Sequence, residues 1–135
     1  MIKSAQLGKE IVVTVGNKIG VLADMSKLVA DHGINIDAVA GYAAGNEAKI
    51  MLVTGDNLRT VDALIKAGYK TVKEEEVVVV ELENKTGALK NITAALASQS
   101  IDIKHVYGTV CAGGCPAKIV LSTTDNEKAL VTFKK

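Results

Sequence analysis

The sequence has few aromatic residues, little net charge and no long apolar run. One Phe, three Tyr and no Trp among 135 residues are too few for a surface that stacks nucleic-acid bases. The formal net charge is +1 and no basic stretch stands out, so we expect no electrostatic binding to nucleic acid or to an anionic membrane. The apolar runs are strand-sized, well short of the roughly 20 residues that a membrane-spanning helix needs.

The sequence begins without a signal-peptide pattern and contains only two cysteines. The first residues, Met1–Ser4, contain no apolar signal-peptide segment, so we expect a cytoplasmic protein. The two cysteines are Cys111 and Cys115, and in a reducing compartment we expect thiols rather than a structural disulfide. Apolar residues make up 48% of the chain and charged residues 23%, a balance typical of a globular protein.

The most informative feature that is present is a short motif that occurs twice. Asn17–Leu22 reads Asn-Lys-Ile-Gly-Val-Leu, and Asn84–Leu89 reads Asn-Lys-Thr-Gly-Ala-Leu at a shift of 67 residues. Each copy follows β-branched residues and precedes apolar residues at helical spacing, which predicts a strand, a turn and a helix. The free N–H groups at such a helix start, together with the helix dipole, favour binding of a carboxylate or a phosphate.

The elements around each copy of the motif follow one order. In the first copy we predict a helix after the motif, a second helix capped by Asp56, and strands at residues 10–15, 34–43, 48–54 and 69–72. In the second copy we predict a helix at 88–99, a final helix capped by Asp125, and strands at residues 77–82, 101–110 and 117–123. The order βαββαβ is that of the ferredoxin-like α+β fold, with two helices on one face of an antiparallel sheet.

The duplication predicts two domains, residues 1–76 and residues 77–135. The charged run Lys73–Glu76 is interpreted as a solvated junction between them. The second domain ends before its last strand, so the strand at 77–82 would be an uncovered apolar edge that attracts another strand. We expect it to be covered either by residues 1–9 or by an edge strand of a second subunit, and we favour a homodimer.

The doubled Asn-Lys-x-Gly-x-Leu motif resembles the signature of ACT domains, small ferredoxin-like regulatory modules that bind amino acids. The resemblance continues into Ile34-Asn35-Ile36 and Ile101-Asp102-Ile103, and the chain as a whole is similar to stand-alone tandem-ACT proteins. It departs from the family at Ile19 and Thr86, where Pro is common. It also departs at Val15 and Leu82, where serine-sensing members have a ligand-contacting His.

The resemblance implies a free amino acid as effector, bound at the strand–helix turns. The backbone N–H groups of the turn would hold the carboxylate, and Asn35 or Asp102 would accept from the ammonium group. The side chains of Asn17 and Asn84 either touch the ligand or only hold the turn. The candidate ligand-binding residues are Asn17, Ile19, Gly20, Val21, Leu22 and Asn35 in the first copy, and Asn84, Thr86, Gly87, Ala88, Leu89 and Asp102 in the second.

No constellation for catalysis and no cofactor motif can be argued from the sequence. We therefore predict a regulator without its own enzymatic activity, with no cofactor and no metal, that acts on a metabolic enzyme partner. The alternative is a small ferredoxin-like enzyme subunit or a metal or redox protein that uses Cys111 and Cys115. Nearby residues lend that alternative little support, since the closest histidine is His105, six residues before Cys111.

Overall fold

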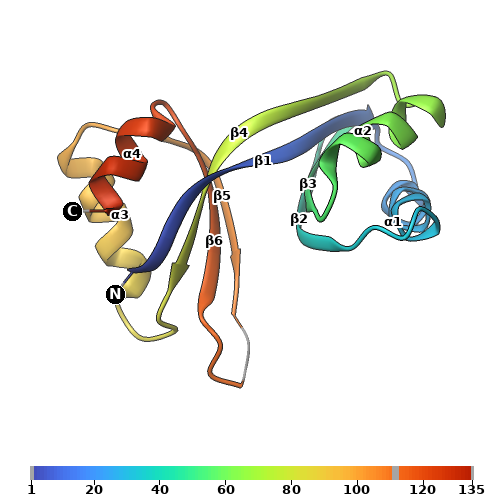
Figure 1. Cartoon of the computed structure of the whole chain (residues 1–135). Helices are drawn as coiled ribbons and strands as arrows, with labels where there is room; N and C mark the ends of the chain where they lie inside the picture. Colours follow the sequence, from blue (N-terminus) through green and yellow to red (C-terminus); the bar gives the residue numbers. More distant parts are fainter. Residues whose placement is uncertain (1, 111–112, 135) are drawn as a thin grey trace. The chain divides into compact units, whose positions relative to one another are not determined.

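The computed structural model describes residues 2–110 and 113–134 (Figure 1). In chain order the elements are β1 (Ile2–Gly16), α1 (Val21–Asp31), β2 (Ile36–Ala44), β3 (Glu47–Thr54), α2 (Asn57–Lys66), β4 (Thr71–Leu82), α3 (Ala88–Ser98), β5 (Ile103–Thr109), β6 (Ala117–Thr123) and α4 (Asn126–Phe133). The strands form an antiparallel six-stranded sheet in the order β2-β3-β1-β4-β6-β5. This confirms the predicted α+β fold class. No helix in the described part of the chain is long and apolar enough to cross a membrane.

The chain forms two compact units, which we name by how they are assembled. The contiguous unit is Lys9–Glu75, and the composite unit combines Met1–Gly8 with Glu76–Lys135. Helices α1 and α2 belong to the contiguous unit and α3 and α4 to the composite unit, while β1 and β4 each contribute a part to both. The domain division predicted at residues 76 and 77 falls within β4.

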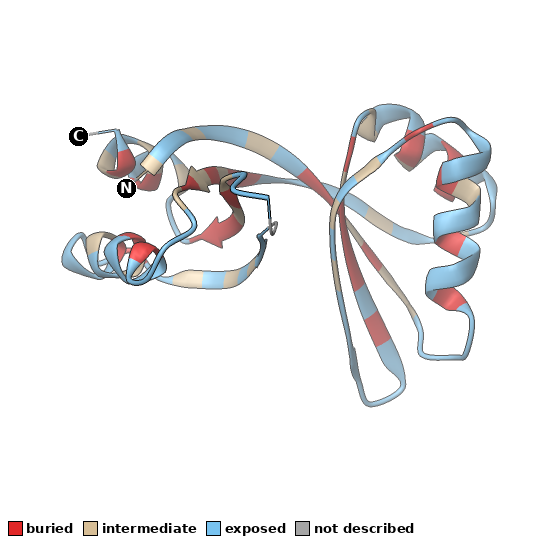
Figure 2. Cartoon of the chain, turned by 90° about the horizontal axis from the view of Figure 1, so that it is seen from below, coloured by how far each residue is buried: buried red, intermediate tan, exposed pale blue. Residues whose placement is uncertain are grey.

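The contiguous unit has a core between one face of its strands and its two helices. On α1 the buried residues Val21, Met25 and Val29 recur every four positions, as expected for a helix that packs one stripe against a sheet. Alternate residues of the strands face this stripe, because successive side chains of a strand point to opposite faces. Figure 2 shows the buried positions on helices and strands. The core comprises Ile11, Val13, Val21, Met25, Ile50, Leu52 and Leu64.

The composite unit obtains its fourth strand from the start of the chain. In chain order the second repeat runs β4-α3-β5-β6-α4, so the prediction that it lacks its last strand is confirmed. The first part of β1 lies beside β4, where Ile2 and Ala5 pack against the core of this unit. A Cβ atom built on Gly8 would lie 3.2 Å from Cγ2 of Val79, so the two strands approach closely here.

This arrangement corrects one expectation and selects another. Val77, Val78 and Val80 are fully buried, and β4 is an inner strand of the sheet rather than an edge. The prediction that a second subunit covers the strand at 77–82 is therefore wrong. The alternative prediction, that the chain's own first residues cover it, is confirmed. The run Lys73–Glu76 is exposed, as predicted, and the boundary between the two units falls within it, between Glu75 and Glu76. The junction is not a loop, because β4 continues through it.

Each unit contains a hydrogen-bonded motif that the sequence analysis identified only in part. The predicted caps are confirmed, since Asp56 caps α2 and Asp125 caps α4. The residue after each cap was missed: the Asn57 side chain donates to the backbone oxygen of Lys9 at 3.0 Å, and Asn126 donates to that of Glu76 at 3.0 Å. The same two side chains accept from the hydroxyls of Thr54 and Thr123, at 2.7 Å in both cases. These bonds tie the second helix of each unit to its first strand.

Candidate functional site

The repeated motif forms the turn between β1 and α1 and the turn between β4 and α3. Backbone N–H of Asn17 donates to the backbone oxygen of Asn46 at 2.8 Å, which holds the first turn against the β2–β3 hairpin. Gly20 precedes α1 with φ of 93°, and Gly87 precedes α3 with φ of 85°. Both values lie in the left-handed region, which glycine adopts without the steric cost of a Cβ atom. The glycine of the motif is therefore explained by the backbone of the turn.

Helices α1 and α3 begin without a side-chain cap, unlike the other two helices. Asp56 accepts from the N–H of Arg59 at 3.2 Å in α2, and Asp125 accepts from the N–H of Lys128 at 3.0 Å in α4. No side-chain hydrogen bond caps α1 or α3. Apart from the N–H of Ala88 in α3, which donates to the backbone oxygen of Lys85, the first N–H groups of these two helices are therefore left for water or an anionic ligand.

The first turn opens on a hollow of about 260 Å³, here called the turn hollow. It brings together four of the predicted site residues, namely Asn17, Gly20, Val21 and Leu22, and it is also lined by Lys18, Tyr42, Ala43, Ala48 and Ile50. The analysis of the sequence missed Tyr42, because its position matters only once the strand register places the end of β2 near the turn. The hollow thus combines the N–H groups at the start of α1 and the Asn17 amide with an apolar wall that includes Leu22 and Ile50.

Asn17 and Asn84 are available for a ligand. Within residues 2–110 and 113–134, neither side chain makes a hydrogen bond to the backbone of its turn. This argues against the interpretation that these side chains only hold the turn. Ile19, in contrast, is fully exposed and does not line the turn hollow.

The second turn differs from the first in its hydrogen bonds. The N–H of Ala88 donates to the backbone oxygen of Lys85 at 3.2 Å, and Ala88 is buried. The ammonium of Lys85 lies 3.1 Å from a carboxylate oxygen of Glu83. This hydrogen bond and the positive charge hold the pKa of Glu83 below its usual range. Thr86 and Leu89 are exposed.

The structure does not bring Asn35 to the turn of its own unit. Gly16 and Ala44 both pair with Glu47, so the end of β2 lies at the turn, whereas Ile36 pairs with Thr54 at the other end of the sheet. The Asn35 side chain instead donates to Asp37 at 2.8 Å. A helix that joins two parallel strands returns the chain to the starting end of the sheet, and this separates the two positions.

Asp102 has the corresponding position in the composite unit. Its backbone oxygen accepts from the N–H of Thr124 at 3.0 Å, and its N–H donates to the hydroxyl of Thr124 at 3.1 Å. β5 starts here, with Ile103 paired to Thr123, while Thr109 at its other end pairs with Lys118. Asp102 is thus placed at the far end of its strand from the second turn, as Asn35 is from the first.

The cysteine pair falls partly outside the described residues. Cys115 is disulfide-bonded, so the expectation of a free thiol is wrong for this residue. Cys111 lies outside the described residues, and so does any site that combines the two. Among the residues that the structure describes, no group of three or more His, Cys, Asp or Glu side chains is arranged to hold a metal ion. His105 and Tyr107 are both partly buried, and their rings are stacked with centroids 6.1 Å apart.

Several solved structures have a fold similar to that of this chain. The fold of protein BT0572 from Bacteroides thetaiotaomicron is similar, with a TM-score of 0.88 at 21% identity over 96% of this chain and 88% of that one. The ligand-free regulatory subunit of aspartate kinase from Thermus thermophilus gives a TM-score of 0.69 at 13% identity, covering 98% and 96%. The Thermus flavus regulatory subunit gives 0.61 at 13% identity, with the same coverage. A search of curated proteins found no significant match.

The sequence itself matches a known domain family. Residues 9–64 match the ACT domain, and this range begins with the second part of β1 and includes the first turn, α1 and the turn hollow. The range lies within the contiguous unit. The predicted resemblance is confirmed within this range: residues 9–64 match the ACT domain, and each of the two units has a ferredoxin-like fold.

Proposed function

We propose that this chain is a regulatory protein that binds a free amino acid and has no catalytic activity of its own. The observation that carries the proposal is the uncapped start of α1 opening on the turn hollow within the ACT domain. The fold similarity to regulatory subunits of aspartate kinase supports the regulatory role. We propose by analogy that the partner is an enzyme of amino-acid metabolism.

In this proposal the carboxylate of the amino acid meets the N–H groups at the start of α1. The helix dipole favours the negative charge there, and the Asn17 amide lies beside the same hollow. Leu22 and Ile50 provide an apolar wall for the side chain of the ligand. Regulatory affinities are micromolar to millimolar, so about 4–8 kcal/mol of binding free energy suffices.

The ammonium group needs an acceptor from outside the turn, because Asn35 lies at the far end of the same unit. We propose that a second copy of the chain supplies it, through Asn35 or Asp102. The second turn, with Asn84, Thr86, Gly87, Ala88 and Leu89, is proposed as the corresponding site of the composite unit. There the bond from Ala88 N–H to Lys85 removes one donor from the ligand, so we expect the weaker affinity at that turn.

We propose a homodimer that forms through β2 or β5 rather than through β4. These are the two edge strands of the sheet, and an edge offers unpaired N–H and C=O groups to another strand. Both edges carry exposed apolar side chains, Val39 and Tyr42 on β2 and Val106 on β5, with exposures between 48% and 54%. Light scattering should find a dimer that Val39→Lys or Val106→Lys weakens.

Thermal melting with each of the twenty amino acids tests the proposed ligand class. A ligand that binds only the folded protein raises the melting temperature, by an amount that grows with its concentration above Kd. We expect at least one amino acid to do so, and Gly20→Val to abolish the effect, because its side chain would cover the first N–H groups of α1. Gly33→Val is the matched control, since Gly33 also has a positive φ and open space at Cβ, yet lies beyond the other end of α1.

The proposed function fails if no amino acid at saturating concentration raises the melting temperature. The turn hollow as the place of binding fails if Gly20→Val and Gly33→Val respond alike to the same amino acid.

A further inference from the structure

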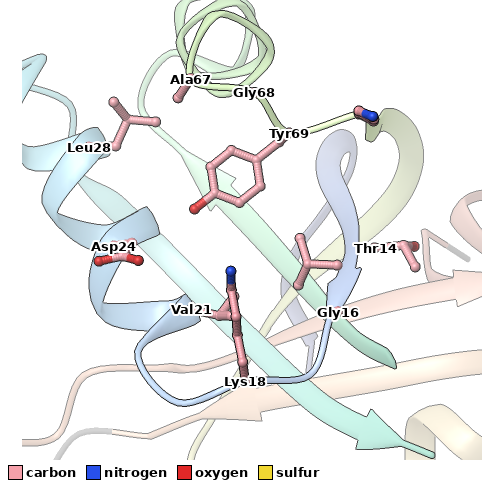
Figure 3. Close-up of a pocket in the computed structure, with 11 residues that line it drawn as sticks. Thr14, Gly16, Lys18, Val21, Asp24, Leu28, Ala67, Gly68 and Tyr69 are labelled. Atoms are coloured by element: carbon pink, nitrogen blue, oxygen red, sulfur yellow. The ribbon is translucent and has the colours of Figure 1, made fainter. Parts of the chain in front are cut away.

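A second and larger hollow lies on the other side of the start of α1. Its volume is about 610 Å³, and it opens between α1 and the segment that links α2 to β4 (Figure 3). We call it the Tyr69 hollow. All of its lining residues belong to the contiguous unit, and they are Thr14, Val15, Gly16, Lys18, Val21, Asp24, Leu28, Ala67, Gly68, Tyr69 and Lys70.

Three polar side chains converge in this hollow. Figure 3 shows the amine of Lys18, the carboxylate of Asp24 and the hydroxyl of Tyr69 directed toward a common space. Lys18 lies in the turn between β1 and α1, Asp24 lies in the first helical turn of α1, and Tyr69 lies in the link between α2 and β4. Burial, and to a lesser degree the negative charge of Asp24, raises the pKa of Tyr69. A phenol is protonated at neutral pH already at its ordinary pKa of about 10, so the Tyr69 hydroxyl can donate a hydrogen bond.

The two charges in the hollow are not neutralised by ion pairs. Elsewhere on the same surfaces ion pairs do form, as between Lys27 and Asp31 at 2.6 Å and between Lys66 and Asp62 at 3.0 Å. Within the described ranges, neither Lys18 nor Asp24 has an oppositely charged partner within 4.0 Å. A positive and a negative group thus face one hollow without pairing with each other.

The walls and the size of the hollow suit a small ligand. Val15, Leu28 and Ala67 give it apolar surface between the polar groups. Its volume lies within the roughly 300–1,000 Å³ that is typical of small-molecule sites, which combine apolar walls with a few placed polar groups. A charge-assisted hydrogen bond at each end would fix the orientation of a molecule that carries both charges.

We propose that the Tyr69 hollow is a second binding site, specific for a small dipolar molecule that carries an ammonium and a carboxylate group. Asp24 accepts from the ammonium, Lys18 donates to the carboxylate, and the Tyr69 hydroxyl donates to the carboxylate from the opposite wall. The site is distinct from the turn hollow, which shares Lys18 and Val21 with it but contains neither Asp24 nor Tyr69. The proposal does not require that the turn hollow binds an amino acid.

In the composite unit, the described residues do not form the equivalent of this site. Asn91 stands at the position that corresponds to Asp24, and Lys85 is paired with Glu83 at 3.1 Å. Among the described residues of that unit, no segment corresponds to the link that carries Tyr69, since the fourth strand there is the first part of β1. The proposal therefore predicts one such site per chain.

The three tyrosines of the chain provide a separate reporter for each place. Tyr42 lines the turn hollow, Tyr69 lines the second hollow and Tyr107 lies on β5 of the composite unit. Isotope-labelled tyrosine in the full chain gives three ring signals, which the three Tyr→Phe variants assign. Titration with each of the twenty amino acids then reports binding at each place independently. We expect one or more of them to shift the Tyr69 signal in a saturable way.

Variants and ligand analogues test the roles of the charges. Asp24→Asn should weaken the response of Tyr69 by about tenfold or more, the effect expected from loss of one charged hydrogen bond. Asp31→Asn on the same helix is the matched control and should change nothing. The amide of the active amino acid, which lacks the carboxylate, should bind as weakly as its N-acetyl derivative, which lacks the ammonium.

The outcomes separate this proposal from the proposed function. A saturable shift of Tyr69 that Asp24→Asn weakens supports the second site, whether or not Tyr42 responds. A shift of Tyr42 without a shift of Tyr69 overturns the second site and leaves the turn site in place. A Tyr69 response with equal midpoints in the natural sequence and in Asp24→Asn also overturns it, as does the absence of any Tyr69 shift.

Discussion

In the contiguous unit Lys18 extends into a hollow that also contains Asp24, whereas in the composite unit Lys85 is held by Glu83 at 3.1 Å and Asn91 replaces the aspartate. The backbones of the two turns are nevertheless alike, with a glycine of positive φ and a helix start without a side-chain cap. The difference shows that the duplicated fold does not carry a duplicated set of charges. The two units therefore offer different chemistry to a ligand.

The bonds that both units retain lie away from the turns. Asn57 and Asn126 make the same three hydrogen bonds, two accepted from a threonine and one donated to a backbone oxygen of the first strand. These bonds connect the same elements in both units, the second helix and the first strand. We conclude that the hydrogen-bonded framework is common to the two units, and that the contents of the hollows distinguish them.

The largest effect should come from removal of Ile2–Gly8. This strand belongs to the composite unit only, and without it the valines of β4 lose their cover. We expect the composite unit to lose about 3 kcal/mol or more, the value of one or two buried aliphatic side chains. Amide hydrogen exchange measures it: protection should collapse at Val77–Leu82 and persist at Ile50–Val53. Equal protection in both segments would contradict the division into these units.

A second pair of variants tests the shared framework. Asn57→Ala and Asn126→Ala each remove the acceptor of a threonine N–H and hydroxyl and the donor to a backbone oxygen of the first strand. Among the described residues, the threonine hydroxyls keep only the bond that they accept from the N–H of the cap residue and, for Thr54, the contact with the Thr60 hydroxyl. We expect each to destabilise its own unit by about 1–3 kcal/mol, the cost of leaving buried polar groups unpaired. Denaturant unfolding of both variants gives the comparison. A large loss for one and none for the other would show that the motif does not serve both units equally.

A smaller effect concerns the ion pair of the second turn and depends on pH. Lys85 lowers the pKa of Glu83 in the folded state, so the pair stabilises the composite unit above the unfolded pKa of Glu, about 4.3. This contribution disappears as the pH falls through the folded pKa. The melting temperatures of the natural sequence and of Glu83→Gln should therefore differ slightly at neutral pH and converge in acid. The difference should shrink in high salt, because the pair is exposed. A constant difference at all pH values would contradict this account.

The smallest effect is on the titration of Tyr69. Asp24→Asn removes the negative charge that disfavours the phenolate, so the pKa of Tyr69 should fall. It should stay above the ordinary value, since burial is the larger cause of the shift. Ultraviolet or NMR titration of the tyrosines measures it, with Asp31→Asn as the control. An unchanged pKa of Tyr69 in Asp24→Asn would show that the carboxylate does not act on the hollow.

Much of the fold could be predicted from the sequence because turns and helix caps are specified by residues close together in the chain. The doubled Asn-Lys-x-Gly-x-Leu motif identified both turns, and Asp56 and Asp125 stood where helix caps belong. The absent last strand was predicted from the length of the second repeat. The strand that replaces it could only be proposed as one of two candidates, since Ile2–Gly8 carries a weak pattern and lies far from β4 in the chain.

The candidate site was predicted less well, because it depends on which ends of the elements meet. Asn35 follows the first helix closely in the chain, yet the crossover carries it to the opposite end of the sheet from Asn17. Tyr42 and Tyr69 are brought to the start of α1 only by tertiary structure. No spacing rule links Lys18 and Asp24 to Tyr69, which lies beyond two further strands and a helix.

Calorimetric titration of the full chain with the twenty amino acids tests most directly whether this protein binds a free amino acid. We expect saturable heat with at least one of them, at a Kd between micromolar and millimolar, retained in Gly33→Val and lost in Gly20→Val at the turn hollow. Saturable heat that survives Gly20→Val and is lost in Asp24→Asn would place binding in the Tyr69 hollow alone. Titrations without saturable heat for all twenty amino acids would contradict the proposed function.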